Sequence, residues 1–258
     1  MDALYVFKHS QFGDEEIRYS LRSVNQYLPY IRKVWILGDC PSFVSDDRLL
    51  IQHVSHEEVA WVGRYNVPVR NTFLMLFLAS LIPELDSEFL WFCDDFLLID
   101  YLSEIDAKQA RYVEDMEKVA NRGQGLFKDA LWRTYDVLRR LGYYGWNFET
   151  HVATYFTKRW VLDAFKDLQD YVSEDRFYGL IGPTAILNHA LKENPRRLIH
   201  LASEGRRAGF HGKPASYEVI AELCSGRTFL NFDDDGYGNG MRRYLAERFP
   251  TPCIYEKP

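Results

Sequence analysis

The sequence lacks the features that mark several classes of protein. No apolar run reaches the roughly 18 uncharged residues that a membrane span needs, and the best candidate, residues 72–83, has the length of a buried helix. The N-terminus begins with an acid and soon becomes polar, so we expect no signal peptide there. The chain also has no internal repeat, no low-complexity stretch and no flexible linker. These absences favour one globular unit.

Cysteine is scarce and widely spaced. The four residues are Cys40, Cys93, Cys224 and Cys253. No pair has the close spacing of a zinc site, and a chain of this size does not need disulfides to hold its core together. We therefore predict free thiols and a cytoplasmic location.

The composition supplies ample material for a packed core, since 47% of the 258 residues are hydrophobic and 16% are aromatic. The formal net charge of −6 is unevenly spread, because residues 1–100 hold 15 Asp and Glu against 8 Lys and Arg. An acidic first part favours metal binding. Basic clusters for phosphate or for an acceptor come later, at Arg139-Arg140, Arg196-Arg197, Arg206-Arg207 and Arg242-Arg243. A solvated mixed surface is the simpler interpretation of any one such pair.

Strand and helix signals alternate through the first hundred residues. The spacing of apolar residues predicts strands over residues 3–7, 33–39, 48–54 and 88–99, and helices over residues 14–28 and 71–82. Strands separated by single helices indicate an α/β fold with a largely parallel sheet. Later residues are mainly helical by the same criterion, with helices at 107–121, 128–142, 158–168, 182–194 and 241–249 and strand-like pieces at 149–156 and from 228. We expect one compact domain over residues 1–258.

Polar side chains follow three of the predicted strands at the point where each strand ends. Lys8 and His9 follow the first, Asp39 follows the second, and Asp94 and Asp95 interrupt the fourth. The carboxyl ends of parallel strands share one edge of the sheet, and ligands bind in the crevice there. The sequence therefore predicts a ligand site at this edge.

Asp94 and Asp95 are the clearest candidates for chemistry. Adjacent acids at a strand end suit a hard divalent cation, Mg²⁺ or Mn²⁺, which takes one or two protein carboxylates and completes its shell with water and phosphate oxygens. A strand-to-turn junction that merely tolerates Asp is the structural alternative.

Three further features have both a functional and a structural interpretation. The acidic run around Asp234 is either a flexible turn or an acid for the same metal or an acceptor hydroxyl. His151, among apolar and aromatic neighbours, is either a core histidine or a ligand. Arg18 and Arg22 share one helix face, where they either clamp a diphosphate or form surface ion pairs.

Five segments, in order along the chain, resemble the signature blocks of the Stealth-type sugar and sugar-phosphate transferases and their short bacterial and phage relatives. They are residues 15–39 (with EIRYSLRS at 16–23), 70–80, 89–99, 148–165 and 229–256 (ending in FPTPCIYE). The chain departs from the family pattern at Cys93, where the family has Asn, and at Ala153, where it has Pro.

The resemblance implies a GT-A-like fold, in which residues 1–100 bind nucleotide and metal and residues 101–258 form a mainly helical acceptor side. It also implies roles for single residues. Together with the strand-end argument, it predicts metal binding by Asp94 and Asp95, catalytic roles for Asp95, Asp234 and His151, and donor binding by Lys8, His9, Arg18, Ser20, Arg22, Asp39 and Asn71. A nearby arginine would balance developing charge, and we choose Arg176 as the catalytic candidate for this role.

These expectations lead to one main hypothesis and several alternatives. The main hypothesis is a metal-dependent glycosyltransferase that moves a sugar from a nucleotide sugar to a hydroxyl of a polysaccharide, a glycan or a hydroxymethylated base in DNA. Transfer of hexose 1-phosphate would need the same metal and the same leaving-group stabilisation. A third alternative is non-catalytic binding of nucleotide or nucleic acid, for which Tyr143, Tyr144 and Trp146 would offer stacking surfaces.

Overall fold

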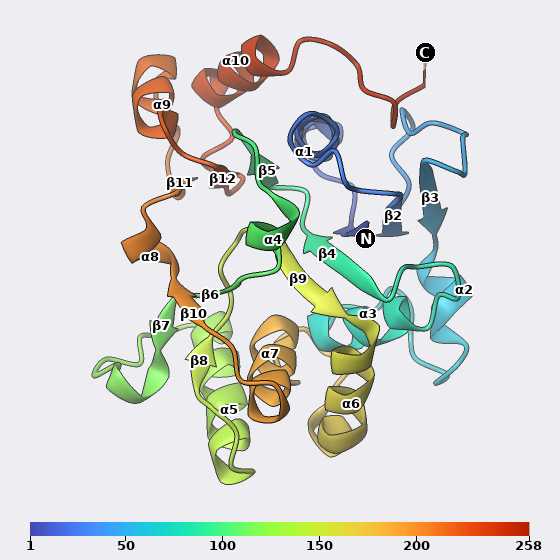
Figure 1. The fold of residues 1–258 in the computed structure, drawn as a ribbon, viewed down its shortest axis with the longest axis vertical. Coiled ribbons are helices and arrows are strands. Elements are labelled where there is room, and N and C mark those ends of the chain that lie inside the picture. The colour runs from blue at the N-terminus through green and yellow to red at the C-terminus, as the bar shows by residue number, and fades with distance from the viewer. Residues whose placement is uncertain (258) are drawn as a thin grey trace.

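The computed structural model describes residues 1–257, the side chain of Glu193 excepted, and is built on a five-stranded sheet (Figure 1). The sheet has the order β3-β2-β1-β4-β9. Its first four members run parallel, and the last is antiparallel. The strands are β1 (Asp2–Phe7), β2 (Val34–Gly38), β3 (Ile51–Val54), β4 (Glu88–Phe92) and β9 (Thr154–Thr157). The predicted α/β class is confirmed.

Helices cover both faces of this sheet. On one face lies α1 (Glu15–Tyr27), and on the other lie α3 (Thr72–Ser80), α6 (Lys158–Leu168) and α7 (Gly182–Glu193) (Figure 1). The chain reverses its direction across the sheet after β3, and right-handed crossovers then place α1 and α3 on opposite faces. The reversal leaves a topological switch point between β1 and β4, and in open α/β sheets ligands bind beyond the carboxyl ends of the strands at such a point.

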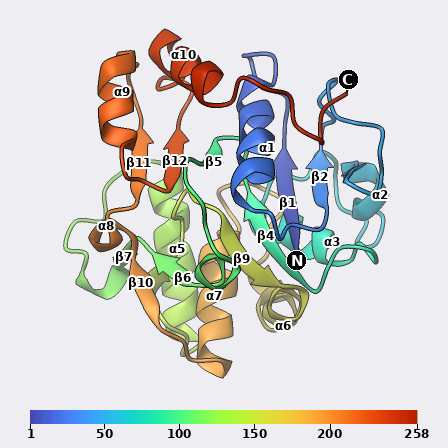
Figure 2. The same ribbon diagram turned by 45° about the horizontal axis from the view of Figure 1, so that its top comes forward.

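The apolar run at 88–99 is divided between two sheets. After β4, residues 93–95 form a turn, and β5 (Phe96–Leu98) then joins a second, three-stranded sheet of order β11-β12-β5. Its other strands are β11 (Arg207–Phe210) and β12 (Phe229–Phe232), which lie below α9 (Tyr217–Cys224) and α10 (Asn239–Arg248) (Figure 2). A second hydrophobic cluster fills this layer. Asp94 and Asp95 thus lie where the chain crosses between the sheets.

Hydrogen bonds from α1 hold this crossing in place. The Ser20 hydroxyl donates to the carbonyl of Phe96 over 2.5 Å, and the buried Tyr5 hydroxyl lies 2.8 Å from Ser20 Oγ. One helical turn later, Ser23 Oγ accepts from the Leu98 amide at 3.1 Å. The backbone that follows the acid pair is therefore fixed by side chains of the first helix.

The second half of the chain contains more strands than the spacing of its apolar residues predicted. Helices end close to the expected residues, and α5 stops at Arg140, before Gly142, which has a φ of +78°. Short strands accompany them, however, and four of these pair in two separate two-stranded sheets. The elements not yet named are α2 (His56–Ala60), α4 (Glu104–Ala107), β6 (Ala110–Tyr112), β7 (Glu114–Asp115), α5 (Leu126–Arg140), β8 (Trp146–Asn147), β10 (Leu198–His200), α8 (Leu201–Glu204) and the short 3-10 helices η1 (Met116–Lys118) and η2 (Gln169–Tyr171).

The prediction of a helix over residues 107–121 is wrong. Residues 110–112 form β6 and pair in parallel with β10, and β7 pairs with β8. The side chain of Arg111 is buried and reaches Asp106 Oδ1 at 2.5 Å and Glu204 Oε2 at 2.9 Å. These long-range partners outweigh the local helical spacing, because a buried guanidinium needs its carboxylates.

Across residues 1–257, none of the helices combines the length and the apolar character that a bilayer crossing requires. The division into a nucleotide-binding half and an acceptor half stays a prediction. In space the two halves interlock, since β5 pairs with β12 and β9 pairs with β4.

The end of the chain is fastened to α1 by a buried ion pair. Arg22 contacts both carboxylate oxygens of Glu256, at 2.6 and 2.8 Å, and donates to the Phe249 carbonyl at 2.7 Å. The Glu256 side chain is only 5% exposed. Breaking such a pair leaves an uncompensated buried charge.

We predict that Glu256→Gln lowers the free energy of unfolding by about 3 kcal/mol, because Arg22 then lacks its counter-charge. Urea denaturation measures this loss. The control is Glu247→Gln, which breaks an exposed pair with Arg243 on α10 and should leave the midpoint unchanged. Equal midpoints for the two variants would contradict the assigned role of the pair.

Candidate active site

The strand ends that were predicted to share one edge of the sheet lie together in the structure. Phe7 pairs with Gly38, and Tyr5 pairs with Phe92, so the ends of β1, β2 and β4 lie side by side. At this edge the amide of His9 donates to Asp39 Oδ2 at 2.8 Å. Lys8 and His9 are exposed there. The structure thus brings Lys8, His9 and Asp39 to one place.

Gly38 is required where β2 ends beside β1. Its φ of +121° is one that side chains rarely adopt, and a Cβ there would lie 2.1 Å from the carbonyl oxygen of Phe7. A larger residue would push β2 away from β1 and displace the adjoining Asp39.

The second sheet brings another set of residues to the same place. Asn231 of β12 pairs with Phe96, so the acids after β12 lie beside the acid pair. Asp234 accepts a hydrogen bond from Gln11 Nε2 at 3.1 Å, and its charge raises the pKa of Asp94. Asp233, by contrast, accepts from the amide of Gly236 in its own loop and from the amide of Gly212 in the loop after β11. Asp234 is therefore the acid of this run that faces the site.

The acid pair is electrostatically unsatisfied. Burial raises the pKa of Asp94 to about 6, with contributions from Asp234 and Asp14 and opposition from backbone amides. Burial and the charge of Asp94 raise the pKa of Asp95 well above its usual value, and Glu16 and Asp234 add to this. No ion pair among residues 1–257 involves Asp94 or Asp95. The pair is thus prepared for a positive partner.

Glu16 is a member of this acidic group that the sequence analysis missed. Glu16 is buried, with only 4% of its surface exposed, and its Oε2 has no hydrogen-bond partner among the described residues. Burial raises its pKa to about 7, with Asp94 and Asp234 adding to the effect and the Ser10 hydroxyl opposing it. The sequence did carry a signal, an acid in the first helical turn, but such acids also stabilise helix termini.

Asp94 and Asp95 are suited to supply two carboxylate ligands to a divalent cation. Within the described residues, no group of three or more His, Cys, Asp and Glu side chains is arranged to hold a metal ion. Two carboxylates are nevertheless enough for Mg²⁺ or Mn²⁺ when water and ligand phosphates complete the shell. The uncompensated charge of Asp94 and Asp95 supports this fit.

His151 lies next to the acid pair, at the start of the segment that leads into β9. Its backbone is left-handed, with a φ of 53°, and its ring meets Phe96 edge-on at 5.9 Å. The residue is exposed at the surface, although neighbouring atoms cover much of the ring. This loss of hydration, with the charges of Arg207 and His211, lowers the pKa of His151 to about 4. The imidazole is neutral at pH 7.

Several residues predicted to bind the donor make contacts within the protein instead. Ser20 and Arg22 form the bonds described above. Arg18 stacks on Phe43 at 4.3 Å, with its Nε 3.7 Å from Glu256. Their roles in donor binding stay predictions, and the contacts indicate that these residues position the crossing and the C-terminal segment.

Asn71 also makes contacts within the protein, between the start of α3 and the loop that contains Arg176. The residue is fully buried, and its Oδ1 accepts from the amides of Phe73 and Leu74 at the start of α3. Its Nδ2 donates to the carbonyl of Leu180 at 3.0 Å. It also lies 3.3 Å from the carbonyl of Asp175, the residue before Arg176.

Arg176 itself is exposed, and its guanidinium lies over the Phe177 ring at 5.2 Å. Burial and the two neighbouring acids raise the pKa of the Cys93 thiol, and the charge of Arg176 opposes this. Arg176 therefore lies within electrostatic reach of the turn that carries Asp94 and Asp95.

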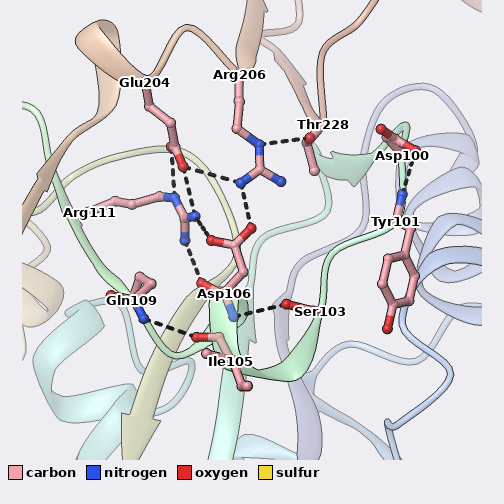
Figure 3. Close-up of polar contacts among 10 residues, drawn as sticks. All are labelled: Asp100, Tyr101, Ser103, Ile105, Asp106, Gln109, Arg111, Glu204, Arg206 and Thr228. Atoms are coloured by element: carbon pink, nitrogen blue, oxygen red, sulfur yellow. Dashed lines mark hydrogen bonds and ion pairs between the residues drawn. The ribbon is translucent and has the colours of Figure 1, made fainter.

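The arginine pairs mostly contact acids and rings of the protein. Arg206 approaches Asp106 at 2.5 Å and Glu204 at 3.3 Å, in a network that also contains Arg111 (Figure 3). Arg206 joins this network and Arg207 does not, and a role of the arginine pairs in binding an acceptor stays a prediction. The proposed stacking surface is also partly occupied, since Trp146 packs on Tyr112 at 4.6 Å.

Two surface cavities lie away from the acid pair. One of about 400 Å³ lies between Asp100, Arg227 and α10, and one of about 320 Å³ lies between Tyr112 and His200. Neither includes a predicted site residue. We assign the site to the open sheet edge, because the strand ends and the unpaired acids converge there.

Comparison with known proteins supports the resemblance for part of the chain. Residues 11–116 match the model of the Stealth protein CR2, conserved region 2. This range contains three of the five blocks, including the first-helix signature and the acid pair, and the resemblance is confirmed there. The blocks at 148–165 and 229–256 lie outside it.

Two individual proteins are similar to the chain. Exopolysaccharide phosphotransferase SCO2594 of Streptomyces coelicolor (strain ATCC BAA-471 / A3(2) / M145) is 31% identical over 86 residues, which are 33% of this chain and 14% of that relative. The chain therefore matches about a seventh of the relative's length. The structure of galactosyltransferase LgtC with donor and acceptor sugar analogs has a TM-score of 0.47 and 14% identity, over 98% of both chains.

We predict that the acidic group of Asp94, Asp95 and Glu16 increasingly destabilises the metal-free protein as the pH rises from about 4 towards 7. Asp94, Asp95 and Glu16 have raised pKa values in the folded state, so the fold retains protons that the unfolded chain has already released. Their stabilising contribution is complete below the unfolded pKa values and is lost as the pH rises through the folded ones.

Asp95→Asn removes one of these charges and should raise the free energy of unfolding at pH 7 in EDTA by about 1.4 kcal/mol for each unit of pKa shift. It should also flatten the pH dependence. Urea denaturation at pH 5 and pH 7 measures both effects, with the exposed neighbour Asp235→Asn as control. An Asp95→Asn variant with the pH dependence of the wild type would contradict this electrostatic account.

Proposed function

We propose that the protein is a metal-dependent transferase that moves a sugar from a nucleotide-sugar donor to a hydroxyl of a polysaccharide or glycan. One observation carries the proposal. Two carboxylates without a cationic partner lie next to the topological switch point of a parallel sheet. Ligands bind at such points, and a divalent cation with a diphosphate is the partner that best satisfies this charge.

The donor would lie along the carboxyl ends of β1, β2 and β4. Lys8, His9 and Asp39 would line the nucleoside end, and their position after β1 and β2 supports this. Asp94 and Asp95 would hold Mg²⁺ or Mn²⁺ against the diphosphate. The cation would stabilise the negative charge of the leaving nucleoside diphosphate.

The acceptor would approach from the side of His151 and Asp234. His151 has a neutral imidazole at pH 7, which is able to accept a proton. Asp234 is exposed and lies close enough to Asp94 for their charges to interact. Either residue is a candidate base for the acceptor hydroxyl, and Arg176 would balance charge that develops near Cys93.

Transfer of a sugar phosphate is a second candidate. The similarity to an exopolysaccharide phosphotransferase and the match to a Stealth region favour it. The two reactions differ in the bond that breaks, at the anomeric carbon for sugar transfer and at the β-phosphorus for sugar-phosphate transfer. A donor labelled in the β-phosphate distinguishes them. Sugar transfer leaves the label in the released nucleotide, and sugar-phosphate transfer carries it into the product.

We predict that Asp94→Asn and Asp95→Asn each lower kcat/KM by about 100-fold or more, because the leaving group loses several kcal/mol of stabilisation. EDTA should abolish wild-type turnover, and added Mn²⁺ should restore it. Product formation from a panel of nucleotide sugars provides the assay.

Asp235→Asn is the matched control, since it changes a nearby exposed acid and should keep wild-type turnover. Circular dichroism confirms that the variants are folded. Near-native activity of both Asp94→Asn and Asp95→Asn in the presence of chelator would disprove the proposed function.

A further inference from the structure

Arg207 carries a positive charge that the protein does not balance. The residue is partly buried at the start of β11, and Nη1 donates to the carbonyl of Thr150 at 2.9 Å. In the part of the chain that the structure describes, no carboxylate forms an ion pair with it. Burial lowers its pKa, and no acid opposes this effect. A partly desolvated charge without a counter-ion is costly unless an anion joins it.

The neighbouring residue, Arg206, has its positive charge balanced by two carboxylates. Arg206 contacts Asp106, Glu204 and Thr228, and Figure 3 shows its guanidinium among these three side chains. The two arginines are adjacent in sequence, yet only one has its carboxylates. The difference marks Arg207 as a residue that faces a ligand.

Arg207 and His211 both lie within electrostatic reach of His151. His151 follows Thr150, whose carbonyl Arg207 binds, and the rings of His151 and His211 lie 6.3 Å apart. Asn231 Nδ2 donates to His211 Nε2 at 3.2 Å, and His211 Nδ1 lies 3.7 Å from Asp233 Oδ2. Asn231 is fully buried, and so it fixes one edge of the exposed His211 ring.

One member of this group contacts the segment that carries the acid pair. His151 packs on Phe96, the residue after Asp95, and Asn231 pairs with the backbone of Phe96. Phe96 thus connects the acid pair to His151, which in turn neighbours His211 and Arg207. A group that bridges a cation and a guanidinium fits this arrangement.

We propose that Arg207, His151 and His211 form a subsite for a phosphoryl group. The guanidinium would donate to phosphate oxygens in its planar fork geometry, and the imidazoles would supply further donors or acceptors. The proposal rests on the proposed function for its neighbour, the metal-bound diphosphate. The phosphoryl group belongs either to the donor or to a phosphate on the acceptor, because the chemistry of recognition is the same.

Calorimetric titration with inorganic pyrophosphate in EDTA tests the subsite without metal and without turnover. We expect Arg207→Gln to weaken binding at least tenfold and His211→Asn to weaken it about threefold. Arg207→Lys keeps the charge and should retain part of the affinity. The control Arg159→Gln changes an arginine whose side chain is 86% exposed, and it should bind as the wild type does.

Binding within twofold of the wild type in both Arg207→Gln and His211→Asn would overturn the proposal. Thermal unfolding confirms that the variants are folded. Loss of pyrophosphate binding in a protein that shows no metal-dependent transfer would keep the subsite and reject only the proposed function.

In the transfer assay, the KM values of Arg207→Gln identify the source of the phosphoryl group. A raised KM for the nucleotide sugar assigns it to the donor, and a raised KM for the acceptor alone assigns it to the acceptor. Unchanged KM values for both substrates would contradict the subsite.

Discussion

The passage of the chain from one sheet to the other, over residues 93–95, is the constraint on which the rest of the structure depends. Before it, β4 lies in the centre of the parallel sheet, and after it, β5 pairs with β12. Hydrogen bonds from Ser20 and Ser23 fix the backbone that follows. The backbone that carries Asp94 and Asp95 is therefore held between the two sheets, which keeps the two carboxylates close together. Their mutual repulsion persists until a cation or a proton relieves it.

The same crossing explains why the signature of the first helix is present. Its serines bond the backbone beyond the acid pair, and Arg22 holds Glu256 near the end of the chain. Asn71 caps α3 and bonds the loop that carries Arg176. Residues that the motif suggests as ligands thus make contacts within the protein, next to the residues of the proposed site. The polar residues of a sequence motif therefore include those that support a site as well as those that contact its ligand.

Much of the first hundred residues could be predicted from the sequence. Apolar runs located β1, β2 and β4, and the rule for parallel strands placed Lys8, Asp39 and Asp94 at one edge. The division of the run at 88–99 could not be foreseen, because an apolar strand has the same pattern in either sheet. The helix predicted at residues 107–121 does not form, because Arg111 pairs with Asp106 and Glu204 and the distant β10 pairs with β6.

The acidic side of the site was clearer in the sequence than the basic side. Asp94 and Asp95 contrast with apolar neighbours, so local sequence revealed them. Arg207 was one of eight paired arginines and His211 was not singled out, and their nearness to His151 appears only in the folded structure. The difference between Arg206 and Arg207 is likewise invisible in sequence, since it depends on which of the two faces Asp106 and Glu204.

The central claim is that the acid pair holds a divalent cation against a diphosphate. Titration of Mn²⁺ followed by its electron paramagnetic resonance signal, with and without a nucleoside diphosphate, tests this claim most directly. We expect each ligand to tighten the other by the same factor, as linkage requires, and we expect this coupling to vanish when Asp94 and Asp95 are both changed to Asn. Equal Mn²⁺ affinity and equal coupling in the wild type and the double variant would contradict the claim.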